Sequence, residues 1–162
     1  GGSRFCVSLA RIEDRQPLIG VIVAPALQET FAACRHQGAT LNEQPIRAAG
    51  TTDPGHSIIE VGWSLRRSNQ DFLSLCKRLF DIGATLRHGG SGALGLADVA
   101  AGRMDAYAEL HINLWDVAAG LVILAEAGAS ISDFMHGEGL VAGNPILACT
   151  QGLWDTLSAL VL

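Results

Sequence analysis

The sequence predicts a layered α/β fold of the α+β type, in which sheets and helices form stacked layers. The first fifty residues carry short β-rich runs separated by turn residues, which is typical of an antiparallel meander. From residue 57 onward, β-rich runs alternate with segments of helical periodicity. The 162 residues match the size of one domain. We therefore expect a single domain over 1–162, with antiparallel strands in 1–50 and an α/β layer in 57–162.

The N-terminal strands are recognised by their β-rich residues and by the turns between them. Residues 38–46, GATLNEQPI, should form a further hairpin, in which Glu43 stands at a turn position that suits glycine better. The polar run 48–55 is expected to be a surface loop. The three strands of the meander are predicted at 5–12, 18–24 and 29–35.

Helix boundaries in the second half are marked by capping residues and glycines. Ser68 followed by Asp71 is a variant of the capping box, while Gly83 and Gly128 are suited to end helices. Thr150 is expected to cap the closing helix. The helices are predicted at 69–82, from the glycine-rich start 89–91 to about 102, at 117–127, and from 150 to 162. Strands are predicted at 57–62, 84–87, 105–110, 129–133 and 146–149.

Composition restricts the kinds of partner. The net charge is −5 and the pI is near 5.4, which argues against a nucleic-acid-binding surface. No apolar run reaches membrane-spanning length and no signal peptide opens the chain, so we expect no membrane contact. Hydrophobic residues make up 49% and charged residues 17%, which indicates that part of the surface faces a partner. The four cysteines are scattered singly, as in a reduced cytoplasmic protein.

The chemistry of the chain is concentrated between Arg87 and Gly128. A phosphate can sit on the N-terminus of the helix that follows Gly90, where unpaired N–H groups and the helix dipole favour anions. Asp116 stands where the apolar helix that begins at Val117 is expected. A carboxylate at that position can cap the helix or hold a metal ion, and the residues alone permit both.

This stretch resembles the inositol monophosphatase family, whose members are magnesium-dependent, lithium-sensitive phosphatases. The spacing of the matching residues follows the family pattern without a gap, and the W-D-x-A-A-G element makes the match specific. The resemblance extends over nearly the whole chain, and it implies the α-β-α-β-α sandwich of the sugar-phosphatase superfamily. The matching residues are Arg87, Gly90–Ser91–Gly92, Val99–Ala100–Ala101–Gly102–Arg103, Asp105–Ala106–Tyr107, Glu109, Trp115–Asp116–Val117–Ala118–Ala119–Gly120 and Glu126–Ala127–Gly128.

The resemblance also implies roles for individual residues. Asp116 corresponds to a family ligand of magnesium that also contacts a substrate hydroxyl, and Glu109 corresponds to the acceptor of a substrate hydroxyl. For Glu109, a solvated acid at a strand end is an equally weighted interpretation. Gly90, Ser91 and Gly92 match the backbone contacts to the substrate.

The neighbours of these residues are expected to have structural roles. Trp115 should pack and fix the turn rather than contact a ligand. Arg87 could reach a phosphate, but bracing of the fold through an acid such as Asp116 or Asp105 is the favoured interpretation. His88 and His111 should line the site. The pair Arg66–Arg67 could meet an anionic substrate, although an exposed basic pair is the simpler interpretation.

One part of the family pattern is missing. Most family metal ligands come from a glutamate and a D-P-[IL]-D-G-T motif, and neither occurs here; Asp53–Pro54–Gly55 lacks the second aspartate and the Gly–Thr pair. Residues 1–8 align with the segment that directly follows this motif. The resemblance thus implies the C-terminal portion of such an enzyme, and the missing N-terminal segment of the same fold becomes an expected partner.

Two functional hypotheses follow. In the first, the intact parent hydrolyses a small phosphate monoester with Mg²⁺, and this chain supplies substrate-side residues and one metal ligand while being inactive alone. Relatives act on inositol phosphates, histidinol phosphate, nucleotide 3′-phosphates and sugar bisphosphates, so the ester stays open. In the second, the chain is a non-catalytic scaffold or oligomerisation module of the same fold. Family members are commonly dimers, which makes a homodimer the expected assembly.

Overall fold

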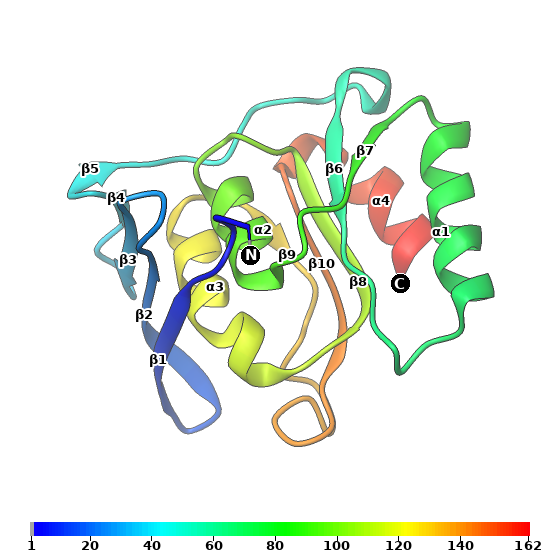
Figure 1. Ribbon diagram of the computed structural model, residues 1–162. Coiled ribbons are helices and arrows are strands. Elements are labelled where there is room, and N and C mark those ends of the chain that lie inside the picture. The colour runs from blue at the N-terminus through cyan, green and yellow to red at the C-terminus, as the bar shows by residue number, and fades with distance from the viewer. Residues whose placement is uncertain (1) are drawn as a thin grey trace.

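The computed structural model describes residues 2–162, so Gly1, the first residue of the predicted domain, lies outside the described residues. Five consecutive strands come first along the chain, and strands mixed with helices follow them, as Figure 1 shows. The strands are β1 (Val7–Glu13), β2 (Gln16–Ala24), β3 (Glu29–Cys34), β4 (Ala39–Leu41), β5 (Gln44–Pro45), β6 (Ile58–Val61), β7 (Thr85–Arg87), β8 (Ala106–Ile112), β9 (Ser130–Ile131) and β10 (Asn144–Cys149). The helices are η1 (Pro54–His56), α1 (Asn69–Asp81), α2 (Gly92–Ala100), α3 (Leu114–Glu126), η2 (Gln151–Leu153) and α4 (Trp154–Val161).

The strands form two five-stranded sheets. The first sheet has the order β1-β2-β3-β4-β5 and is antiparallel throughout. The second has the order β7-β6-β8-β10-β9, in which β6 pairs in parallel with β7 and β8 while β10 runs antiparallel to β8 and β9. This arrangement confirms the predicted antiparallel meander and the α/β layer that follows it.

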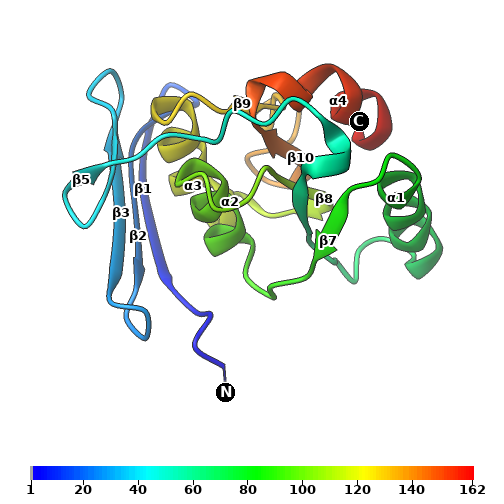
Figure 2. The ribbon, with the colours of Figure 1, turned by 90° about the horizontal axis from the view of Figure 1, so that it is seen from above.

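The layers follow one another in the order first sheet, α2 with α3, second sheet, α1 with α4 (Figure 2). This confirms the layered fold class. One core cluster lies around α2 and α3, whose residues are apolar on nearly every face, as expected for helices covered on both sides. A second cluster lies between the second sheet and α1 and α4, where Leu75 and Leu79 form the buried side of the amphipathic α1.

Most predicted boundaries agree with the structure to within about two residues. Ser68 caps α1 by accepting from the Asp71 amide, and Gly83 follows that helix with a φ of 84°. The predicted hairpin at 38–46 is also present as β4 and β5, joined by Asn42 and Glu43, with φ values of 48° and 66°. Both turn residues are therefore in the left-handed region.

Three local predictions are wrong. Helix α3 begins at Leu114 rather than at Val117, and Asn113 is its N-cap residue. Strand β8 continues to Ile112, so Glu109 lies inside the strand and not at its end. Thr150 stands at the N-cap position of the short η2 helix, which leads directly into α4, but its side chain makes no capping hydrogen bond; its hydroxyl donates to the Thr51 carbonyl oxygen 2.8 Å away.

Within the described part of the chain, no helix is long and apolar enough to cross a membrane.

Candidate functional site

The five residues that the resemblance assigned to substrate and metal line one cavity of about 740 Å³. Gly90, Ser91 and Gly92 come from the start of α2, Glu109 from β8, and Asp116 from the first turn of α3. These segments are separate in the sequence. The fold thus brings together all of the predicted site residues, while their chemical roles stay predictions.

The start of α2 forms one wall of the cavity. Ser91 is the N-cap residue, and its hydroxyl accepts from the Leu94 amide at 3.4 Å. Gly90 precedes it with a φ of 74°, a left-handed conformation that glycine adopts without strain. Because the first amides of a helix have no partner within the helix, this wall presents donors suited to an anion.

Glu109 is buried in a second wall, with an exposed fraction of 7%. The Tyr107 hydroxyl, two residues earlier on the same face of β8, donates to Glu109 Oε2 at 2.5 Å. Burial raises the pKa of the Glu109 carboxyl, and the hydrogen bond from Tyr107 opposes that rise. The interpretation of Glu109 as a solvated strand-end acid is therefore wrong. Alternation along the strand was the signal that could have identified Tyr107 as its partner.

Asp116 is half-buried in the first turn of α3, three residues after the N-cap residue Asn113. Asp116 is thus not the N-cap, and the capping interpretation is wrong. Burial raises the pKa of the Asp116 carboxyl, while a hydrogen bond with Asn113 and the positive charge of Arg66 lower it. A carboxylate at the cavity wall, with burial disfavouring its charge, would gain from a bound cation.

The described residues do not by themselves fit a complete magnesium site. Within 2–162, no group of three or more His, Cys, Asp or Glu side chains is arranged to hold a metal ion. Asp116 and Glu109 line the cavity, but Glu109 is already engaged by Tyr107. Mg²⁺ prefers several oxygen ligands, and a pair of ions needs more. Among the described residues, Asp116 is thus a single cavity carboxylate that could serve as an oxygen ligand, without the further ligands of a magnesium site.

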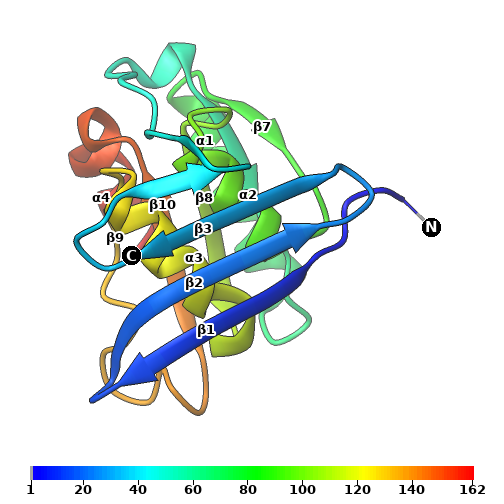
Figure 3. The same cartoon turned by 90° about the vertical axis from the view of Figure 1, so that its left-hand side faces the viewer.

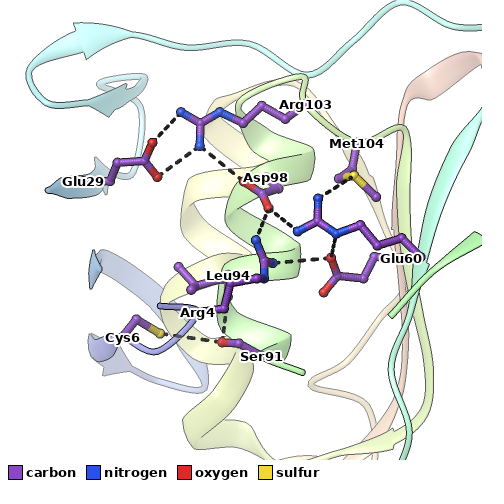
Figure 4. A network of polar contacts seen from close by, with 10 residues as sticks. Arg4, Cys6, Glu29, Glu60, Ser91, Leu94, Asp98, Arg103 and Met104 are labelled. Atoms are coloured by element: carbon purple, nitrogen blue, oxygen red, sulfur yellow. Dashed lines mark hydrogen bonds and ion pairs between the residues drawn. The ribbon is translucent and has the colours of Figure 1, made fainter. Parts of the chain in front are cut away.

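An ionic network that the sequence analysis missed supports the cavity wall (Figure 4). Arg4 donates to Asp98 Oδ2 at 2.9 Å and to Glu60 Oε2 at 3.3 Å, joining the segment before β1 to α2 and β6. Burial raises the pKa of the Glu60 carboxyl, and the Arg4 and Arg87 cations oppose this rise. Arg103 extends the network by pairing with Glu29 at 2.7 Å and with Asp98 at 3.4 Å. No motif or spacing in the sequence signals that Arg4 and Glu60 meet.

Arg87 braces the fold, but through acids other than those predicted. Its Nε lies 3.2 Å from Glu60 Oε2, and its Nη2 lies 3.5 Å from Asp98 Oδ2. The predicted partner Asp105 instead accepts from the Thr51 hydroxyl and the Ile58 amide. Asp105 therefore anchors a loop and the start of β6.

Of the remaining residues predicted to lie beside the site, His88 and Trp115 line the cavity and His111 does not. His88 lines the cavity, with Nδ1 2.8 Å from the Val61 carbonyl oxygen. His111 does not line it, because its Nε2 lies 2.8 Å from the Ala142 carbonyl oxygen on another loop. Trp115 lines the cavity and is 66% exposed, so the prediction that it packs to fix the turn is wrong.

Comparison with known proteins places this chain in a family. A model of the inositol monophosphatase family matches residues 1–161. The chain is 40% identical over 140 residues to the Nus factor SuhB of Xylella fastidiosa, covering 85% of this chain and 51% of that protein. It is 38% identical over 132 residues to the inositol-1-monophosphatase of Synechocystis, covering 80% of this chain and 46% of the relative.

Solved structures show the same likeness. The inositol monophosphatase of Anabaena superposes with a TM-score of 0.86 at 32% identity, covering 97% of this chain and 63% of the other. The extragenic suppressor protein SuhB of Bartonella henselae gives a TM-score of 0.88 at 27% identity, covering 98% and 62%. The chain spans between 46% and 63% of the length of these four relatives. It belongs to the inositol monophosphatase family.

Proposed function

We propose that this chain is the substrate-binding portion of a Mg²⁺-dependent phosphomonoesterase that acts on a small, inositol-phosphate-like ester. The observation that carries the proposal is the meeting of Gly90–Ser91–Gly92, Glu109 and Asp116 around one cavity. Relatives named inositol-1-monophosphatase support the reaction class. SaIMPase-II, also similar to this chain, has been solved with inositol monophosphate and with 2′AMP, which supports a ring-bearing phosphate as the substrate.

Each part of the cavity suits one part of such a substrate. Hydrolysis of a phosphate monoester depends chiefly on neutralising charge and aligning a water molecule. The first amides of α2 can donate to substrate oxygens. Glu109, with Oε2 occupied by Tyr107, can accept from a substrate hydroxyl through Oε1. Asp116 would supply one oxygen to Mg²⁺, and the other ligands would come from outside residues 2–162.

The proposal is tested by phosphate release from inositol 1-phosphate in the protein at its full natural length. Asp116→Asn keeps the size of the side chain and removes its charge. We expect the variant to lose at least about a hundredfold in kcat/KM, since even outer-shell changes at metal sites cost up to that much. Asp133→Asn, an exposed aspartate that does not line the cavity, is the matched control. Full activity of Asp116→Asn would contradict the proposal.

The proposal includes a cytoplasmic location and a homodimer. The four cysteines are free in the described part of the chain, which supports a reducing compartment. Burial raises the pKa of Cys149 to about 12, so its thiol stays protonated near neutral pH.

A second candidate function is a non-catalytic scaffold that associates with a second copy of itself. Val7 and Leu9 of β1 are 65% and 67% exposed, and pairing with β2 places them on the same face as Val21 and Val23. Figure 3 shows this face of the first sheet toward the reader, with no described helix in front of it. Several relatives carry the name Nus factor rather than that of an enzyme.

Size-exclusion chromatography with light scattering separates the two candidates when it is combined with the phosphate assay. The scaffold predicts a dimer that Leu9→Arg converts to monomer, together with no turnover at full natural length. Leu65→Arg, on an 85% exposed leucine outside the sheet, is the control. A wild-type protein that elutes as a monodisperse monomer contradicts the scaffold function.

A further inference from the structure

We propose that Arg4 is a positioning residue of the candidate site, which holds the segment before β1 against the glycine turn before α2 and thereby sets the affinity of the cavity for its substrate. This inference rests on the proposed function and deepens it. Arg4 acts through the two cavity walls that it joins, and not on the reacting atoms. Three observations carry the inference: the ion pairs of Arg4, the scarcity of other polar links from its segment, and the packing of Glu60 beneath the turn.

One wall of the cavity comes from the N-terminal segment, and most of this wall precedes β1. Its lining residues are Arg4, Phe5, Cys6 and Ser8. Within residues 2–162, two side chains of this segment form polar contacts with α2 and its N-cap. Arg4 Nη1 donates to Asp98 Oδ2 at 2.9 Å, and Cys6 Sγ lies 4.0 Å from Ser91 Oγ. Because a thiol is a weak hydrogen-bonding group, the ion pair of Arg4 is the stronger of the two links.

Glu60 extends the link from Arg4 to the glycine turn. Arg4 Nη2 lies 3.3 Å from Glu60 Oε2, and the Glu60 side chain is 2% exposed. A Cβ at Gly89 would lie 2.5 Å from Glu60 Oε1, and a Cβ at Gly95 would lie 2.9 Å from the same oxygen. The carboxylate is thus packed directly against the backbone of the turn and of α2. Because a close-packed interior transmits strain, Glu60 cannot shift toward the turn 89–91 without displacing it.

The shape of the Arg4 guanidinium group suits this link. Two of its nitrogens reach two carboxylates on different elements, Glu60 on β6 and Asp98 on α2 (Figure 4). Both carboxylates are buried, so water screens these ion pairs less than it screens pairs on the surface. A lysine ammonium is a single point charge and does not reproduce the planar fork. The position of the glycine turn therefore depends on an arginine at residue 4, and not only on a positive charge there.

The first experiment measures hydrolysis of myo-inositol 1-phosphate by the protein at full natural length with Mg²⁺. We expect Arg4→Ala to raise KM about tenfold and to change kcat by less than about threefold, because misaligned α2 amides lose contacts that the substrate and the transition state share. Arg4→Lys keeps the charge without the fork, so its KM should lie between those of the wild type and Arg4→Ala. Arg103→Ala is the matched control, since it also removes a partner of Asp98 but does not line the cavity. Its KM should equal that of the wild type.

Amide hydrogen exchange of the same proteins, measured by mass spectrometry, gives a readout that needs no turnover. Arg4→Ala should increase exchange in residues 2–8 and in residues 89–94, whereas Arg103→Ala should increase it in neither segment. If the wild type releases no phosphate, the proposed function fails, and hydrogen exchange decides whether Arg4 joins the two walls. An unchanged KM in active Arg4→Ala, an equal rise of KM in Arg103→Ala, or unchanged exchange of residues 89–94 in Arg4→Ala overturns the inference.

Discussion

Glu109 and Tyr107 show how burial sets the chemistry of single residues in this cavity. The pKa of the Glu109 carboxyl is raised by burial, so the folded state favours its protonated form more than the unfolded chain does. This pKa shift stabilises the folded state, and the stabilisation is fully present when the pH is below the ordinary pKa of a glutamate. It is lost as the pH rises through the raised folded value.

Glu109→Gln should therefore become more stable relative to the wild type as the pH rises from about 4 to about 8. The amide oxygen of glutamine can still accept from Tyr107, and its neutral charge removes the penalty of a buried carboxylate. Denaturant unfolding at several pH values measures the difference in free energy of unfolding. Glu138→Gln, on an exposed loop, is the matched control. A difference for Glu109→Gln that shrinks with rising pH would contradict this account.

Some residue roles could not be predicted because they depend on neighbours from distant segments. Arg4 and Glu60 meet across 56 positions of sequence, and nothing local in either segment indicates the pair. Trp115 is predicted to pack, yet in the first turn of α3 it lines the cavity and is 66% exposed. The family resemblance, in contrast, assigns Asp116 and the glycines at the start of α2 to one site, and these residues line the same cavity.

The β4–β5 hairpin is strained at one position. Glu43 has a φ of 66°, in the left-handed region that glycine adopts without a steric penalty. Glu43→Gly should raise the free energy of unfolding by about 0.5 kcal/mol, because relief of roughly 1 kcal/mol of strain is partly offset by the greater freedom of glycine in the unfolded chain. Thermal unfolding checks this change. Glu43→Ala removes the charge but keeps the strain, so the same gain in Ala would refute the backbone explanation.

Helix α2 tolerates no side chain at Gly95. A Cβ there would meet the Tyr107 ring and would lie 2.9 Å from Glu60 Oε1. Helix propensity alone predicts that Gly95→Ala stabilises the helix by about 1 kcal/mol. Overpacking predicts the opposite sign, a loss of about 1–3 kcal/mol.

We expect Gly95→Ala to destabilise the protein by about 2 kcal/mol, as measured by chemical denaturation. Gly50→Ala serves as the control, because a Cβ at that position meets nothing within 4 Å. A Gly95→Ala protein as stable as the wild type would show that Tyr107 can move aside without loss.

At the level of elements, periodicity and turn residues were sufficient to predict the helices and most strands. The start of α3 at Leu114 could not be predicted from capping chemistry, because the side chain of the N-cap residue Asn113 makes no capping hydrogen bond. Pairing order within the second sheet could not be predicted, since the parallel neighbours of β6 are β7 and β8 and their contact depends on crossover helices.

For the molecule as a whole, Arg4 connects the segment before the first sheet with α2 and with β6 of the second sheet. Arg4 is 25% exposed, while its partners Glu60 and Asp98 are 2% and 8% exposed at their side chains. Without Arg4, Glu60 and Asp98 keep their ion pairs with Arg87, but the charges of these two buried carboxylates are compensated less fully. The partial exposure of Arg4 lets water offset part of that penalty.

Arg4→Ala should lower the free energy of unfolding by about 2 kcal/mol near neutral pH. Arg11→Ala, which removes an exposed pair with Glu13, should change it by less than about 0.5 kcal/mol. Urea unfolding of both variants compares the two ion pairs directly. Equal effects would mean that the network contributes no more than an ordinary surface pair.

The single-domain organisation over 1–162 stays a prediction, which limited proteolysis can address.

We propose that residues 1–162 provide the substrate side of the site and one metal ligand, Asp116, but no complete metal centre. Calorimetric titration of this chain with Mg²⁺, together with a phosphate-release assay on the same sample, tests this claim most directly. We predict millimolar or weaker Mg²⁺ binding and no turnover, since a single carboxylate cannot assemble a paired-ion site. Micromolar Mg²⁺ affinity, or turnover equal to that of the full-length protein, would contradict it.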